Sequence, residues 1–334
     1  MRKLVVVTQK ADPEDPVLGA TVPKLRALAE RVDQLVVLAA SSVPGTLPGN
    51  VRVRHFAAGT KALRGARFEA ALLRELRPRP FALVAHMCPI YAVLAAPVVR
   101  PLRVPIVLWY VHYKVSPTLR LATRLVTRLA SVDRESFPIA TRKLEAIGHG
   151  IDVGAFPCAP ARNGALRLLA LGRYSRVKRL DDVLEALRET GASLTAHGPS
   201  LTPDDRAYRE ELERRARDVG VDARFEGSVP RAEVPALLAA HDALVSNTRG
   251  GADKVVLEAA ASCRPALTSA RAFAPLVDGL ELAFDGPREL TARIERLAVL
   301  DAGARAELGR ELRSRVERSH SVDSWADAII RLTR

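Results

Sequence analysis

The sequence predicts an α/β fold built from two doubly wound domains, and three observations lead to this prediction. The chain has 334 residues, which suits two domains of ordinary size. Residues 4–7 form an uninterrupted apolar strand, as expected when both faces of a parallel sheet are covered. Residues 166–171 form a second such strand, which restarts the pattern of strand, loop and helix.

The first half of the chain alternates predicted strands and helices. A loop follows the first strand, and a helix and a further strand then complete a βαβ unit. The predicted strands cover residues 4–7, 35–39, 51–56, 81–85 and 106–111, and the helices cover residues 20–31, 61–76 and 117–131.

The second half repeats this alternation and ends in helices. Its predicted strands cover residues 166–171, 193–197, 223–225, 243–245 and 266–268, with another near 282–284. Its predicted helices cover residues 180–187, 206–219, 233–240, 287–300, 305–318 and 322–332, and another begins near residue 254 and is stopped by Pro265. Pro157, Pro160 and Gly164 indicate a boundary between the halves.

The composition narrows the class of protein. Apolar residues make up 48% of the chain, which excludes disorder. The formal charge of +13 fits three kinds of partner, namely nucleic acid, an anionic membrane surface or anionic small molecules. The basic residues are spread along the chain without a lysine-rich tail, and many pair with acidic residues on helices, which disfavours nucleic acid.

The cysteines and the apolar runs indicate a cytoplasmic protein. Cys88, Cys158 and Cys263 are odd in number and lack metal-ligand spacing, which argues against a disulfide framework and a zinc site. The first strand is too short to be the apolar core of a signal peptide. The longest uncharged run, residues 81–99, contains two prolines, which favours strand, turn and helix over a membrane span.

Residues 242–268 are the centre of the functional prediction. A short buried strand leads into a polar loop with two glycines, and the loop opens onto a helix that Asp253 could cap. Such a loop can bind phosphate, because the free backbone N–H groups and the positive end of the helix dipole both face the loop. Glu258 lies too deep in the helix to meet phosphate, but it can accept hydrogen bonds from a neutral diol such as ribose.

Basic and histidine side chains follow other strands of the predicted sheets. Arg173 and Lys178 lie in the loop after strand 166–171, where a guanidinium and an amine could stabilise the charge of a leaving diphosphate. His86 and His112 stand at the ends of two strands in the first half. Ligands bind beyond the carboxyl ends of parallel strands, so both histidines are candidates for a site.

Residues 242–268 resemble the sugar-nucleotide signature of retaining glycosyltransferases of family 4, which have the GT-B fold. The signature is a glutamate, seven residues, a second glutamate and then Ala-x-Ala-x-Gly-x-Pro. Glu258 fits the second glutamate, and the tail fits as far as Pro265. Gly250 replaces the first glutamate and Cys263 replaces the glycine. Because the first glutamate normally meets the donor sugar, its loss bears on sugar identity more than on nucleotide binding.

The resemblance also assigns roles to individual residues. It implies that Arg173 and Lys178 hold the diphosphate and that His112 lies near the reacting sugar, with His86 as a further candidate to line the reacting centre. The implied donor-binding residues are Gly19, Arg173, Lys178, Val229, Gly251, Ala252, Asp253, Lys254 and Glu258. Gly19 ends the loop after the first strand, and a glycine needed only for that turn is an equal alternative.

The implied architecture is two Rossmann-like domains facing across a cleft. Residues 1–155 would bind the acceptor, residues 156–318 would bind the nucleotide sugar, and residues 319–334 would cross back onto the first domain. The implied reaction moves a hexose-like sugar from a nucleoside diphosphate to an acceptor hydroxyl with anomeric retention. The sequence has no Asp-any-Asp pair to clamp a metal, so neither a metal nor a cofactor beyond the nucleotide sugar is expected.

Two questions stay open on the residues alone. The predicted helix at 117–131 carries Arg120, Arg124 and Arg128 along one edge. This is either a solvated basic face or a contact with the inner face of an anionic membrane that holds a lipid-linked acceptor. The alternatives to a glycosyltransferase are a sugar-nucleotide epimerase of the same fold, a basic nucleic-acid-binding protein, and a relative made inactive by Gly250.

Overall fold

The computed structural model describes residues 2–15, 18–112, 114–248 and 251–334. The chain divides into two compact units, each built on one parallel sheet. Unit 1 is Met1–Asp152 together with Ser319–Arg334, and unit 2 is Val153–Arg318. The predicted α/β class, with two Rossmann-like domains and parallel sheets, is confirmed.

Unit 1 contains a seven-stranded sheet in the order β3-β2-β1-β4-β5-β6-β7. All its neighbouring strands are parallel. The strands are β1 (Lys3–Ala11), β2 (Gln34–Ser42), β3 (Val51–His55), β4 (Ala82–His86), β5 (Ile106–Trp109), β6 (Arg128–Ser131) and β7 (Leu144–Ala146). The central strand β1 begins with six buried residues because helices cover both faces of the sheet.

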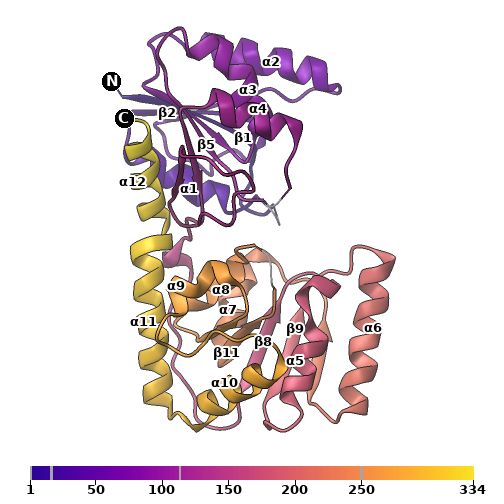
Figure 1. Cartoon of the computed structure of the whole chain (residues 1–334). Helices are drawn as coiled ribbons and strands as arrows, with labels where there is room; N and C mark the ends of the chain where they lie inside the picture. Colours follow the sequence, from indigo (N-terminus) through magenta and orange to yellow (C-terminus); the bar gives the residue numbers. More distant parts are fainter. Residues whose placement is uncertain (1, 16–17, 113, 249–250) are drawn as a thin grey trace. The chain divides into compact units, whose positions relative to one another are not determined.

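Helices cover this sheet (Figure 1). They are α1 (Thr21–Ala29), α2 (Lys61–Arg74), α3 (Pro89–Val99), α4 (Pro117–Leu125) and α12 (Val322–Leu332). On one face, Phe68 of α2, Tyr91 of α3 and Leu119 of α4 join the apolar side chains of the strands in one core. Helices α1 and α12 pack against each other, and Arg31, just beyond α1, donates hydrogen bonds to Asp323 and Asp327 of α12.

The predicted helix at 117–131 is too long. Helix α4 ends at Leu125, because Val126 has an extended backbone with φ −75° and ψ 154°. The Lys143 amine donates hydrogen bonds to carbonyl oxygens at the end of α4. Arg128 begins β6 and pairs with Val107 of β5. Sheet pairing therefore overrides the helical spacing of arginines and leucines.

Unit 2 contains a five-stranded parallel sheet in the order β10-β9-β8-β11-β12. The strands are β8 (Arg167–Leu171), β9 (Ser193–His197), β10 (Ala223–Glu226), β11 (Ala243–Ser246) and β12 (Ala266–Thr268). The α-helices are α5 (Leu180–Leu187), α6 (Pro203–Asp218), α7 (Val234–Ala240), α8 (Lys254–Ala261), α9 (Ala274–Val277), α10 (Pro287–Val299) and α11 (Ala302–His320), whose last two residues belong to unit 1. The strand predicted near 282–284 is a single bridge between Ala283 and Thr268.

The expectation of no disulfide is wrong. Cys158 is bonded to Cys263, and their Cα atoms lie 5.0 Å apart although 105 positions separate them in the sequence. The segment that carries Cys158 runs past the end of α8. There the Arg313 guanidinium donates hydrogen bonds of 2.6 Å to the carbonyl oxygens of Phe156 and Ala261. Cys88 is a buried free thiol.

Candidate active site

The loops at the carboxyl ends of β8 and β11 form the candidate site of unit 2. Gly172 follows β8 with a φ of +138°. A Cβ atom there would lie 3.0 Å from Cε of Lys178, so the glycine leaves room for the lysine to cross it. A Cβ atom at Gly198, after β9, would lie 1.9 Å from the Gly172 carbonyl oxygen. Two glycines therefore allow the loops to approach each other closely.

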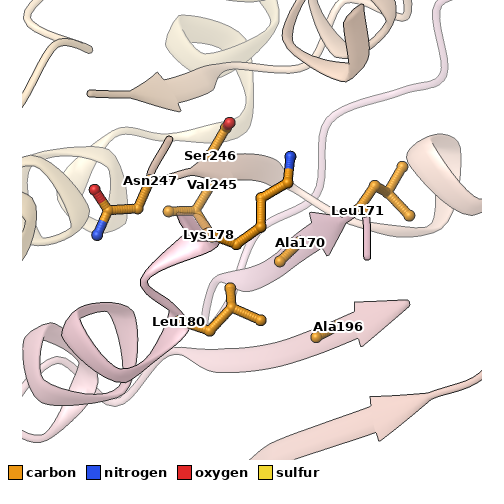
Figure 2. Close-up of a pocket in the computed structure, with 9 residues that line it drawn as sticks. Ala170, Leu171, Lys178, Leu180, Ala196, Val245, Ser246 and Asn247 are labelled. Atoms are coloured by element: carbon orange, nitrogen blue, oxygen red, sulfur yellow. The ribbon is translucent and has the colours of Figure 1, made fainter. Parts of the chain in front are cut away.

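Lys178 lies in this site with a carboxylate beside it. Its amine forms an ion pair with Asp253, and the Ser246 hydroxyl donates a 3.3 Å hydrogen bond to the same carboxylate oxygen. Lys178 and Ser246 line a pocket together with Ala170, Leu171, Gly172, Leu180, Ala196, Val245 and Asn247. Figure 2 shows the Lys178 amine and the Ser246 hydroxyl pointing to the same side of this pocket.

Asp253 is placed as predicted but makes different contacts. It stands immediately before α8, yet its side chain makes no capping hydrogen bond. The carboxylate bonds to Lys178 and Ser246 instead. Gly251 is exposed, with a φ of +84°, and Ala252 is partly buried. Gly250, where the resembled signature has its first glutamate, lies outside the described residues.

Arg173 is the second basic residue of the loop after β8. Its side chain is half exposed, and its Nε lies 3.8 Å from an oxygen of Asp205 in the first turn of α6. Lys178, in contrast, is largely buried. Both predicted cations therefore belong to the connection after β8, and Arg173 is the more exposed of the two.

Glu258 is 1% exposed and is held by two basic side chains. Its Oε1 accepts a 2.7 Å hydrogen bond from Arg231 and lies 3.5 Å from the Lys254 amine. Its Oε2 is buried and has no hydrogen-bond partner within the described part of the chain. Burial lowers the pKa of Lys254, and the nearby Glu258 carboxylate offsets only part of that effect. Glu258 thus presents one paired and one unpaired oxygen.

The sequence prediction missed Arg231 and Asn247. Arg231 lies two positions after the partly buried Val229, in the loop that is predicted to contact the base. Its hydrogen bond to Glu258 places this loop beside α8. The amide of Asn247 donates hydrogen bonds to the Arg179 carbonyl oxygen at 3.1 Å and to Asp182 at 3.2 Å. Asn247 could have been singled out from the sequence, because it is the polar residue directly after a predicted strand. Nothing in the sequence distinguishes Arg231 from a surface arginine.

The three candidates of unit 1 have different environments. A Cβ atom at Gly19 would lie 2.5 Å from the Pro13 carbonyl oxygen, so the packing of its own loop requires a glycine. His86 is buried and stacks on Trp109, with ring centroids 4.8 Å apart. Burial and the nearby Lys24 charge keep the pKa of His86 well below its usual value. His112 is exposed, and its Nδ1 accepts a 2.9 Å hydrogen bond from the Lys114 N–H.

The described part of the chain shows neither a cluster of metal ligands nor a membrane-spanning helix. Residues 2–15, 18–112, 114–248 and 251–334 contain no group of three or more His, Cys, Asp or Glu side chains placed to hold a metal ion. The same residues include no helix with the length and apolar character needed to span a membrane.

The two parallel sheets with their covering helices define the GT-B fold, the architecture of a large class of glycosyltransferases. More particularly, residues 165–299 match the family model "Glycosyl transferases group 1". This match contains every candidate site residue of unit 2. No curated protein sequence matches the chain significantly.

Solved structures of low sequence identity share the fold over almost the full length of the chain. HepE from Anabaena in complex with UDP and glucose is 17% identical, with 99% of both chains covered and a TM-score of 0.72. A glycosyltransferase from Rickettsia africae is 10% identical, with 99% of this chain and 97% of that chain covered and a TM-score of 0.76. The sucrose-phosphate synthase of Thermosynechococcus elongatus is 14% identical, with 99% and 98% covered and a TM-score of 0.71.

Proposed function

We propose that the protein is a glycosyltransferase that moves a hexose-like sugar from a nucleoside diphosphate to an acceptor hydroxyl. The reaction retains the anomeric configuration and uses no metal. The observation that carries the proposal is Glu258, whose buried unpaired oxygen lies within the residues matched by the family model. The structures of HepE with UDP and glucose and with UDP-glucose support a nucleotide sugar as the donor.

In this proposal the diphosphate binds at the loop after β8. Lys178 and Arg173 neutralise the charge that develops as the sugar bond breaks. The Lys178 amine pairs with the Asp253 carboxylate, and the diphosphate competes with Asp253 for this amine. The backbone N–H groups of Gly251 and Ala252 add donors at the start of α8.

The nucleoside binds beside α8. Oε2 of Glu258 accepts hydrogen bonds from the ribose hydroxyls, while Arg231 holds the other oxygen. Lys254 fixes the same carboxylate from one turn earlier in the helix. Backbone groups around Val229 contact the base. Unit 1 binds the acceptor, His112 and His86 are the candidates to line the reacting centre, and Gly19 is the candidate for close approach of the backbone to the donor.

Nucleotide titration tests the donor site. Calorimetry with UDP, GDP and ADP should show micromolar binding of one of them. Glu258→Ala should weaken that binding by about 10- to 100-fold, because hydrogen bonds to a charged group contribute roughly 1.5–3 kcal/mol. Glu307→Ala removes an exposed carboxylate of α11 and should leave the affinity unchanged. Equal nucleotide affinities of the wild type and the Glu258→Ala variant would show that Glu258 does not bind the ribose.

We also propose that α4 contacts the inner face of an anionic membrane that holds a lipid-linked acceptor. Arg120 and Arg124 are exposed on this helix, and Leu121 between them is 44% exposed. Basic side chains beside an exposed apolar one suit an interfacial helix. Vesicles with anionic lipid should sediment the wild type, and Arg120→Glu with Arg124→Glu should abolish this. Arg128→Glu, in strand β6, should have a smaller effect, and equal sedimentation of all three proteins would exclude a role for α4.

A further inference from the structure

The disulfide of unit 2 joins two cysteines that differ in their access to solvent. Cys158 is exposed in residues 156–166, a segment without helix or strand. Cys263 lies just beyond α8 and is 5% exposed. Its φ of +56° is in the left-handed region that favours glycine, so the side chain that forms the cross-link has a conformational cost. A solute can therefore reach the bond from the Cys158 side.

Hydrogen bonds hold the exposed segment against the end of α8 independently of the covalent bond. Arg313 of α11 donates to the carbonyl oxygens of Phe156 and Ala261, at 2.6 Å in both cases. Arg264 donates to the carbonyl oxygen of Pro160 at 3.2 Å. These contacts anchor the segment on both sides of its cysteine. Cleavage of the disulfide should therefore leave the two thiols close together, so that the bond can form again.

Positive charge surrounds the two sulfur atoms. Nη1 of Arg313 lies 3.8 Å from Sγ of Cys158. Cys263 lines one small pocket with Arg264 and Arg305, which are 3% and 5% exposed. A nearby positive charge stabilises a thiolate, which is the form of cysteine that attacks a disulfide and the form that leaves one. The surroundings of this bond therefore favour thiol–disulfide exchange.

We propose that the pair Cys158–Cys263 is a reversible exchange site for a small solution thiol such as glutathione. The thiolate of the small molecule attacks Sγ of Cys158, the exposed cysteine. The bond between the two cysteines breaks, Cys263 leaves as a thiolate that takes up a proton, and a mixed disulfide remains on Cys158. A second small thiolate attacks the outer sulfur of this mixed disulfide. It displaces the Cys158 thiolate beside Arg313 and forms the disulfide of the small thiol.

The same steps in reverse oxidise the reduced protein. Cys158 then attacks the small disulfide, and Cys263 displaces the small thiol from the mixed disulfide. Two small thiols are oxidised for each protein disulfide that is reduced, so no further oxidant or reductant is needed. The covalent link between the exposed segment and α8 thus follows the ratio of thiol to disulfide in solution. This inference does not depend on glycosyl transfer.

Two variants test which cysteine is the point of attack. Cys263→Ser leaves the exposed thiol, and oxidised glutathione should add one glutathionyl group to Cys158, located by mass spectrometry of peptides. Cys158→Ser is the matched control, because it loses the same disulfide but leaves a thiol that is 5% exposed. It should react at least about 10-fold more slowly. Burial raises the pKa of the Cys88 thiol to about 12, so Cys88 should stay unmodified in both. Equal rates for the two variants would overturn the proposal.

The wild-type chain tests reversibility. Reduced glutathione should open the bond in the folded protein, and an excess of oxidised glutathione should close it again. Alkylation after denaturation counts the free thiols, with one expected in the oxidised protein and three in the reduced protein. The intermediate trapped by acid should carry glutathione on Cys158. A bond that glutathione leaves closed would contradict the proposal, and so would a trapped intermediate with glutathione on Cys263.

Discussion

Replacement of Lys178 by alanine is expected to reduce glycosyl transfer by at least about 100-fold, because electrostatic groups at a leaving diphosphate contribute several kcal/mol to catalysis. The lysine is largely buried, and its amine lies across Gly172 at the end of β8. Its removal also leaves the Asp253 carboxylate without its ion-pair partner, and a bare carboxylate repels the diphosphate. Turnover of the donor identified by calorimetry measures the effect.

Two further variants make this test specific. Arg176→Ala removes an exposed cation from the same loop, one that pairs with Glu211 at 2.8 Å, and should change turnover less than about twofold. The double variant Lys178→Ala with Asp253→Ala should regain part of the nucleotide affinity lost in the single variant, because the repelling carboxylate is gone. Unchanged turnover in the folded Lys178→Ala protein would show that Lys178 does not bind the diphosphate.

Replacement of Trp325 by alanine is expected to destabilise unit 1 by about 3–5 kcal/mol, the usual cost of truncating a buried tryptophan. Trp325 of α12 is 1% exposed, and its ring meets that of Trp109 edge to face at 5.9 Å. The buried Lys24 amine lies 3.9 Å above the Trp109 ring and 5.3 Å from the Trp325 ring. Truncation therefore opens a cavity and weakens a cation–π contact.

Tryptophan fluorescence during urea unfolding measures this loss in one unit. The sequence contains two tryptophans, Trp109 and Trp325, and both belong to unit 1. Trp109 still reports on unit 1 in the Trp325→Ala variant. Asp327→Ala, on the same helix, removes a half-exposed ion pair with Arg31 and should cost less than about 1 kcal/mol. Equal unfolding midpoints for the two variants would show that Trp325 does not hold α12.

The sequence predicted the fold because its signal is local. Apolar runs such as residues 4–7 and 166–171 mark buried parallel strands wherever they occur. The same reasoning failed at residues 117–131, where arginines and leucines keep helical spacing across Val126. The extended backbone of Val126 and the pairing of Arg128 with β5 depend on neighbouring strands. Spacing along the chain carries no information about such partners.

The sequence singles out candidate site residues but does not predict their contacts. Arg173, Lys178 and Glu258 stand out because they follow strands or enter a helix after a glycine loop. Arg231 contacts Glu258 from 27 positions away, and no local pattern distinguishes it from a surface arginine. The disulfide between Cys158 and Cys263 was missed for the same reason, since cysteine spacing does not report distance in space.

The position of α12 in unit 1 bears on the order in which the protein is made. The face of the first sheet that α1 and α12 share acquires α12 only after residues 153–318 have been synthesised. Ribosomes add roughly 5–20 residues per second, so that interval lasts roughly 10–30 s. During this time Trp109 and Lys24 lack the cover of Trp325. Unit 2 is therefore complete in sequence before unit 1, whose first sheet lacks the cover of α12 until the last residues of the sequence are made.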